Sequence, residues 1–98
     1  MQRQGAQRAE ARLKAPAGLI RAVVLRRGGA ILDLIITGDF HPRPHTLLRE
    51  MEDALRGAPL DPLILRQRIE QIYNKPEVEV AGVSLEDFVS PLLRASLG

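Results

Sequence analysis

Asp39, His41 and His45 are the residues whose types and spacing come closest to a metal-binding set. A zinc site usually has four nitrogen, sulfur or oxygen ligands, and this chain has no cysteine and no third histidine. His41 precedes an expected helix and His45 lies in its first turn, so spacing alone does not put them on one helix face. We interpret Asp39 as a turn residue and both histidines as loop residues, and we expect no metal site. An enzyme built on His41 and Asp39 is the least favoured alternative.

Hydroxyl groups offer no better case for catalysis. They belong to Thr37, Thr46, Ser84, Ser90 and Ser96, and none lies in the Gly-x-Ser-x-Gly motif that exposes a catalytic serine. The carboxylates within residues 50–53 fall on the polar side of an expected helix, where contact with solvent is the default. Gly28-Gly29 lacks the Gly-Lys-Ser/Thr ending of a phosphate loop. This chemistry predicts a partner module, with no catalytic residue of its own.

Basic residues are concentrated near the N-terminus and suggest a docking face. The two lysines of the chain are Lys14 and Lys75, so twelve of the 14 Lys and Arg residues are arginine. A docking face for an acidic partner or a phosphate-bearing ligand is one interpretation, and a solvated surface is the other. The basic set consists of Arg3, Arg8, Arg12, Lys14, Arg21, Arg26 and Arg27.

Composition narrows the remaining possibilities. The chain has 98 residues, 45% of them apolar, which is enough for one small domain with a single core. A net charge of +2 and 3% aromatic residues argue against nucleic-acid binding, although a small nucleic-acid-binding module remains an alternative. No apolar run approaches the length of a membrane span, and the polar N-terminus lacks a signal-peptide core. We expect a soluble cytoplasmic protein, and the initial Met1 suggests a complete small gene product.

A hairpin dominates the first half of the expected fold. Residues 18–27 and 30–38 are two β-rich runs joined by Gly28-Gly29, the signal of a primed hairpin turn. This turn predicts that Leu25 lies opposite Leu32 and Val23 opposite Leu34, with Leu19 on the same face. Arg21 interrupts that face, and a β-bulge that shifts the register by one residue is the alternative. Residues 11–14 could add a short edge strand, on which a homo-oligomer could form near Leu13.

Helices are expected to follow and to cover one face of this sheet. Residues 44–56 carry an amphipathic pattern, and Asp61 followed by Pro62 predicts a helix that runs to about residue 74. A short extended segment is expected at 76–83. Ser84 and Asp87 predict a capping box, after which Pro91 either kinks the helix or starts a second one. The fold class is therefore α+β, with a flexible N-terminus over 1–8 and a single domain over 9–98.

Two motifs resemble the C-terminal accessory domain of lipoate–protein ligase. One is the run Lys14-Ala15-Pro16-Ala17-Gly18-Leu19-Ile20-Arg21, and the other is Ile36-Thr37-Gly38-Asp39-Phe40 after the glycine hairpin. The helix that closes with residues 52–57 is also similar, and the resemblance covers about residues 9–95. His41 stands where the family often has a second aromatic residue, and Ala17 stands where a fuller Gly-Gly pair is usual.

The resemblance implies a fold and a role. The fold would be similar to that of the iron–sulfur scaffold and sulfur-acceptor proteins, although this chain lacks the cysteines on which their chemistry depends. In the family, the large domain activates lipoate with ATP to lipoyl-adenylate and transfers it to a lysine of an acceptor protein. The small domain is needed for adenylation, and some archaea encode it as a separate polypeptide. The resemblance thus implies a non-catalytic accessory subunit that forms a heterodimer with a large catalytic subunit, which would bind lipoate, ATP and magnesium.

The resemblance also implies roles for individual residues. Lys14 matches the motif lysine, so we expect it to reach the nucleotide or the active-site loop of the large subunit. Shaping of the loop beside Lys14 is expected of the other motif residues, which are Gly18, Gly38, Asp39, Phe40 and His41. Neither a nucleic acid nor a membrane is implied as a partner, and lipoyl-acceptor proteins are implied only through the large subunit.

Overall fold

Two tight turns join three consecutive strands into one antiparallel sheet. The computed structural model describes residues 5–98, and its strands are β1 (Gln7–Ala15), β2 (Gly18–Arg27) and β3 (Ala30–Gly38), in the order β1-β2-β3. Gly28 and Gly29 have φ angles of 63° and 77°, and positive φ at both positions is what a primed two-residue turn requires. The hairpin predicted from the sequence is confirmed, together with its strand limits.

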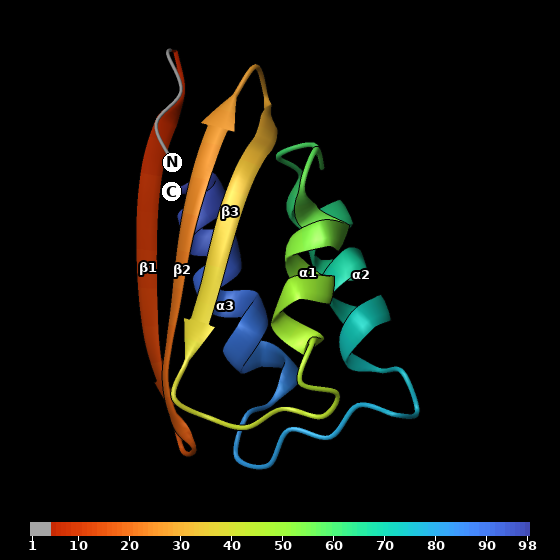
Figure 1. Ribbon diagram of the computed structural model, residues 1–98. Coiled ribbons are helices and arrows are strands. Elements are labelled where there is room, and N and C mark those ends of the chain that lie inside the picture. The colour runs from red at the N-terminus through yellow and green to blue at the C-terminus, as the bar shows by residue number, and fades with distance from the viewer. Residues whose placement is uncertain (1–4) are drawn as a thin grey trace.

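Three helices cover one face of this sheet (Figure 1). They are α1 (Leu47–Leu55), α2 (Pro62–Tyr73) and α3 (Leu85–Leu97). α3 packs across β1 and β2, α1 packs beside β3, and α2 contacts both other helices. The predicted α+β class, with an antiparallel sheet covered on one face, is confirmed. The likeness to iron–sulfur scaffold proteins stays a prediction.

A β-bulge in the β2–β3 pair decides which strand residues face the helices. The register shifts by one residue between Leu25 and Arg26, so Val23 lies opposite Ile35 and Leu25 opposite Asp33. The pairs that we predicted from the turn alone are therefore wrong by one residue, and the bulge that we left open as the alternative is present. A bulge places one extra residue on one strand and redirects the side chains that follow it.

The helix-facing side of the sheet is apolar, and its opposite side carries the charges. Leu19, Val23 and Leu25 lie on the side away from the helices, because Arg21 shares their face and would lose its solvation beneath the helices. The inner side chains are at most 4% exposed, and they belong to Ile20, Ala22, Val24, Ile31, Leu34 and Ile36. We call the opposite side of the sheet, which no helix covers, the open face (Figure 1).

Phe88 of α3 links the core to the chain that leaves β3. It is fully buried and makes an edge-to-face contact with Phe40, with ring centroids 5.8 Å apart. Tyr73 packs on Phe88 at 5.9 Å and donates its hydroxyl hydrogen to the Val83 carbonyl at 2.6 Å. The Phe40 ring folds back over Gly38, where an added Cβ would lie 2.0 Å from Phe40 Cε1. Gly38 is thus required here for space.

Side-chain caps begin two of the helices where the sequence predicts them. The Asp61 carboxylate accepts hydrogen bonds from the N–H groups of Leu63 and Ile64, at 2.9 and 3.2 Å. Ser84 and Asp87 form the predicted capping box, since each side chain accepts a bond from the backbone N–H of the other. Such caps satisfy donors that the first helical turn leaves unpaired.

Other boundaries differ from the sequence-based expectations. The first helix begins at Leu47 instead of residue 44, because Arg43 exchanges two backbone hydrogen bonds with Glu79 and is held extended. This bridge is the only extended pairing that the structure gives residues 76–83, so the short extended segment expected there is reduced to the bridge at Glu79. Pro91 lies inside one continuous helix rather than starting a second one.

At the N-terminus, the edge strand is longer than the predicted 11–14. β1 begins at Gln7, before the expected domain start at residue 9. The expectation of a flexible N-terminus over 1–8 falls partly on residues 1–4, which lie outside the described residues. Within residues 5–98, no helix has the length and apolar character needed to span a membrane.

Replacing the α2 cap should weaken the fold measurably. We expect Asp61→Ala to lower the free energy of unfolding by about 1 kcal/mol, because the N–H groups of Leu63 and Ile64 lose their acceptor. Urea denaturation followed by circular dichroism measures this change. Asp61→Asn is the matched control, since asparagine caps as well as aspartate and should stay near wild type. Equal stability of Asp61→Ala and Asp61→Asn would contradict the capping role.

The close approach of Phe40 to Gly38 generates a second prediction. Gly38→Ala should lower the free energy of unfolding by about 1–3 kcal/mol, because the new methyl group forces the Phe40 ring away from Phe88. A double-mutant cycle with Phe40→Leu tests this reason. Gly38→Ala should cost much less in the Phe40→Leu background, where no ring occupies that space. An identical cost in both backgrounds would mean that the clash is not the cause.

Candidate functional site

Lys14 lies near the end of β1, on the open face of the sheet. It is directly opposite Leu19 of β2, and both side chains are exposed. Among the described residues, Lys14 has neither an ion-pair partner nor a side-chain hydrogen bond. Its ammonium group is therefore available to a partner molecule.

Gly18 and Asp39 bring the start of β2 against the end of β3, beside Lys14. A Cβ added to Gly18 would lie 3.0 Å from both the Cβ and the carbonyl oxygen of Asp39, so the two residues are in close contact. The Asp39 N–H donates to the Leu19 carbonyl at 3.2 Å and extends the strand pairing by one bond. The motif residues Lys14, Gly18 and Asp39, separate in sequence, thus meet at one end of the sheet.

The remaining motif residues continue from Asp39 into the loop 39–46. Phe40 is half-buried against the core and anchors the start of this loop through its contact with Phe88. His41 and His45 are both exposed in the loop. Within residues 5–98, no group of three or more histidine and carboxylate side chains is arranged to hold a metal ion.

A third segment, which sequence reasoning missed, packs under the β1–β2 turn. The Ala17 N–H donates to the Gly82 carbonyl at 3.1 Å, and a Cβ on Gly82 would lie 2.8 Å from the Cβ of Ala17. The φ of Gly82 is +75°, a value that other residues rarely adopt. Together with the backbone bridge between Arg43 and Glu79, this contact joins three connecting segments into one layer at the end of the sheet (Figure 1). Gly82 itself was the only feature of the sequence that indicated this contact.

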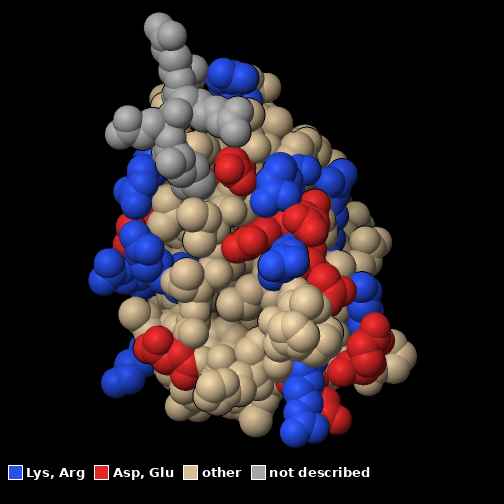
Figure 2. Space-filling view, in the orientation of Figure 1, with Lys and Arg blue, Asp and Glu red and all other residues tan. Residues whose placement is uncertain are grey.

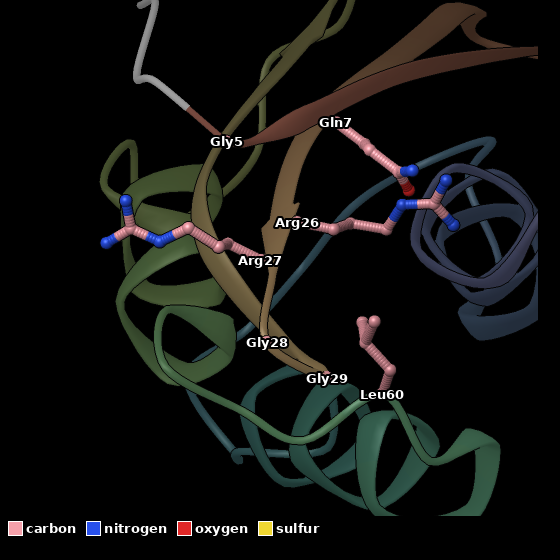
Figure 3. A pocket seen from close by; sticks show the side chains of 7 residues that line it. All are labelled: Gly5, Gln7, Arg26, Arg27, Gly28, Gly29 and Leu60. Carbon is pink, nitrogen blue, oxygen red and sulfur yellow. The ribbon is translucent and has the colours of Figure 1, made fainter.

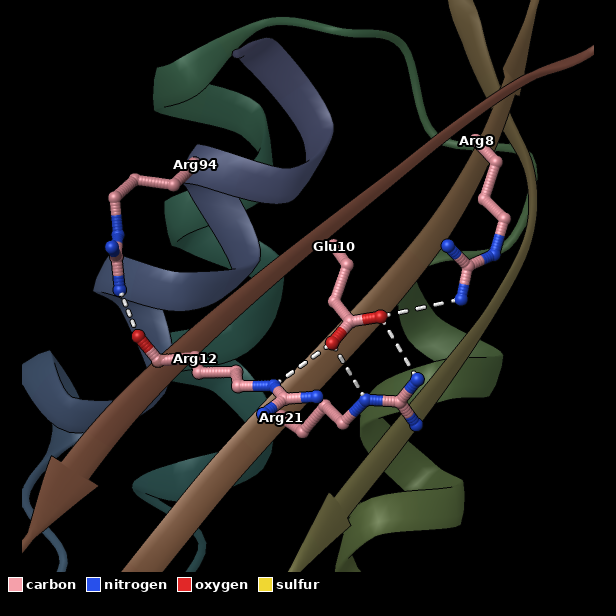
Figure 4. A network of polar contacts seen from close by, with 5 residues as sticks. All are labelled: Arg8, Glu10, Arg12, Arg21 and Arg94. Carbon is pink, nitrogen blue, oxygen red and sulfur yellow. Dashed lines mark hydrogen bonds and ion pairs between the residues drawn. The ribbon is translucent and has the colours of Figure 1, made fainter.

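Glu10 organises the arginines of the open face (Figure 4). Its carboxylate accepts two hydrogen bonds from Arg21 at 2.9 Å each, one from Arg12 at 2.9 Å and one from Arg8 at 3.3 Å. The two bonds from Arg21, followed by the one from Arg12, lower the pKa of Glu10 to about 2. Arg94 of α3 donates to the Arg12 carbonyl at 2.6 Å and ties the helix to the edge of the sheet. The sequence indicated the basic set, but it did not identify Glu10 as the residue that collects it.

Arg26 lies at the opposite end of the sheet, in a shallow pocket of about 300 Å³ (Figure 3). Its guanidinium points toward α3 and donates to the Ser96 carbonyl at 3.0 Å. This places a positive charge at the C-terminus of α3, where it interacts favourably with the helix dipole. Arg27 points away from this pocket. The predicted basic set is thus divided between the open face and this end, with Arg3 outside the described residues.

The surface around Lys14 therefore combines a lysine, a backbone-rich loop layer and the Glu10 arginines. The lysine and the arginines supply positive charge, which suits the binding of anionic groups, and the exposed Asp39 adds one carboxylate beside them. Lys14 and the motif loop were identified from the sequence through the resemblance to the family. The layer beneath the turn and the carboxylate that joins the arginines became visible only in three dimensions.

Comparison with known proteins shows which family the chain is similar to. No protein-family model matches the chain. The chain is 35% identical over 79 residues to lipoate-protein ligase A subunit 2 of Thermoplasma acidophilum, with 81% of each chain covered. It also superimposes with a TM-score of 0.80 on a chain from a structural analysis of an archaeal lipoylation system, a bipartite lipoate protein ligase and its E2 lipoyl domain from the same organism.

This structural match is 33% identical in sequence and covers 89% of the present chain and 96% of the other. Identity at this level across most of both chains, together with the shared fold, indicates common ancestry rather than a likeness of fold alone. The chain belongs to the family of the second subunit of lipoate–protein ligase A.

Proposed function

We propose that this chain is the non-catalytic accessory subunit of a bipartite lipoate–protein ligase. It would act with a large catalytic subunit in the ATP-dependent activation of lipoate to lipoyl-adenylate, before transfer to a lysine of an acceptor protein. The observation that carries the proposal is the similarity to subunit 2 of such a ligase over 81% of both chains. The site between Lys14 and the loop layer supports it, because its groups suit contact with a partner.

The exposed position of Lys14 supports a mechanism for this accessory role. The subunit docks on the large subunit beside its active site and helps to exclude water from the acyl-adenylate, as closing lids do. Lys14 supplies a mobile cation to the nucleotide or to the active-site loop, where positive charge stabilises charge that develops on phosphate. Gly18, Gly38, Asp39 and Phe40 keep the adjoining backbone in place through the contacts described above.

The small subunit binds no cofactor by itself in this proposal. The large subunit binds lipoate, ATP and magnesium, and it also meets the lipoyl-acceptor protein. The two subunits form a heterodimer that works in the cytoplasm. In this proposal, His41 also lies in the region around Lys14 that contacts the large subunit.

Reconstitution tests the accessory role directly. The large subunit from the same source should release pyrophosphate from ATP and lipoate only when this chain is added, and neither protein should do so alone. A coupled pyrophosphate assay measures the rate, and gel filtration shows whether a complex forms. Full activity of the large subunit alone, or the absence of any complex, would contradict the proposal. Steeply salt-dependent binding to DNA or RNA would then favour the nucleic-acid-binding alternative.

Lys14 has a matched control within the chain. We expect Lys14→Ala to lower pyrophosphate release by the mixture about tenfold or more, because a positioned cation near phosphate is lost. Lys75→Ala removes the other lysine, which is 3.0 Å from Glu50 on the helical side, and should leave the rate nearly unchanged. Lys14→Arg keeps the charge and should retain part of the activity. A normal rate for Lys14→Ala would remove Lys14 from the mechanism.

A further inference from the structure

The open face of the sheet has two parts of different chemistry. Register places Arg8, Glu10, Arg12 and Lys14 along β1 on this side. The neighbouring part, on β2 and β3, is apolar at Leu19, Val23, Leu25 and Ile35, with the polar residues Arg21, Asp33 and Thr37 between them. A cationic margin thus lies beside an apolar strip, and neither part is covered by a helix (Figure 1).

Two apolar residues of this strip are exposed. Leu19 is 38% exposed and Ile35 is 44% exposed, although both lie on regular strands. Val23, between Glu10 and Ile35 in the sheet, is only 4% exposed. Long charged side chains commonly cover such apolar surface with their aliphatic stems. Leu25 is likewise 3% exposed, so Leu19 and Ile35 provide the apolar surface that a partner can contact. An apolar patch with a polar margin is typical of a protein interface.

Positive charge is in excess on the β1 and β2 part of this face, whereas Asp33, on the β3 part, is paired with Arg56. On the β1 and β2 side of the face, four cations accompany the single carboxylate of Glu10, and they are Arg8, Arg12, Lys14 and Arg21. In Figure 2, Lys and Arg side chains gather along the margin of the molecule formed by β1, at the left. Glu10 already accepts bonds from three of them, so positive charge is left over for a partner.

The helical side of the molecule is balanced differently. Arg66 is paired with Glu70 and Glu86, and Lys75 is paired with Glu50. Arg56, at the margin between α1 and the sheet, is paired with Asp33 and Asp53. In these pairs positive and negative charges are close to balanced. They therefore attract a charged partner only weakly.

The excess charge also argues against a second copy of this chain as the occupant. A symmetric dimer places the same patch of both copies together, so the cationic margins would face each other. Like charges brought together across an interface cost affinity. The open face therefore fits a partner whose surface carries carboxylates around an apolar patch.

We infer that the open face is the docking surface for the large catalytic subunit, which meets it with an apolar patch bordered by carboxylates. This inference rests on the proposed function. Lys14 and Leu19 belong both to the open face and to the loop end, so docking here brings Lys14 to the partner's surface. Glu10 contributes by holding Arg12 and Arg21 in place before contact, which reduces the side-chain entropy lost on binding.

Two pairs of matched variants test this surface. Arg12→Glu reverses a charge on the open face, at a side chain that is 61% exposed, and Arg49→Glu makes the same change on the exposed side of α1. Ile35→Glu places a charge in the apolar strip, whereas Leu63→Glu does so at a 64% exposed leucine of α2. The equilibrium dissociation constant for the purified large subunit is measured by calorimetry at low and high salt. Circular dichroism checks that each variant is folded.

We expect Arg12→Glu and Ile35→Glu each to weaken binding about tenfold or more, and the two controls to change it less than about threefold. Arg12→Glu should also reduce the salt dependence of binding. Should Ile35→Glu unfold the chain, Ile35→Ala replaces it and should still weaken binding. Wild-type affinity for both open-face variants would overturn the inference, and so would an equal loss for the controls.

Failure of this inference is distinguishable from failure of the proposed function. If wild-type protein restores pyrophosphate release but the open-face variants bind normally, the accessory role stands and docking uses another surface. If wild-type protein neither binds the large subunit nor restores activity, the accessory role itself fails. Light scattering of the isolated chain provides a last check, since a dimer that Arg12→Glu dissociates would assign the open face to self-association and overturn the inference.

Discussion

The register between β2 and β3 is the constraint on which the rest of the structure depends. One extra residue at the bulge puts Asp33 on the open face and leaves Leu34 and Ile36 toward the helices. A one-residue slip in a strand exchanges its two faces, so pairing without the bulge would have mixed charge and apolar surface on both sides. The bulge therefore produces one face that the helices bury and one that they leave uncovered.

The inner face then determines where the helices lie and how the loop end is supported. α3 crosses β1 and β2, and its fully buried Phe88 contacts the aromatic rings of Phe40 and Tyr73. Phe40 belongs to the motif loop, so this loop is packed directly against the core instead of extending freely from the sheet. Because packed interiors tolerate little change of volume, the position of the loop beside Lys14 depends on the core beneath it.

Local chemistry made much of the fold predictable from the sequence. The Gly28-Gly29 turn and the Asp61 and Ser84 caps each depend on residues only a few positions apart, and the structure has them where they were expected. The pairing of β2 with β3 and the start of α1 depend on contacts beyond the nearest residues, as in the bridge between Arg43 and Glu79, and were predicted wrongly. For the site, Lys14 was identified through the family motif. Glu10 was not, because it meets Arg21 only across two paired strands.

The charges on the edge strand β1 affect whether the free chain aggregates. A free strand edge normally invites another chain to add a strand, which leads to aggregation. Every second residue from Arg8 to Lys14 is charged, and Arg94 occupies the Arg12 carbonyl that an added strand would need. The surplus of positive charge along β1 thus opposes the pairing of two copies of the chain through this edge. In the proposed complex, the same side chains would serve both recognition of the partner and solubility of the free chain.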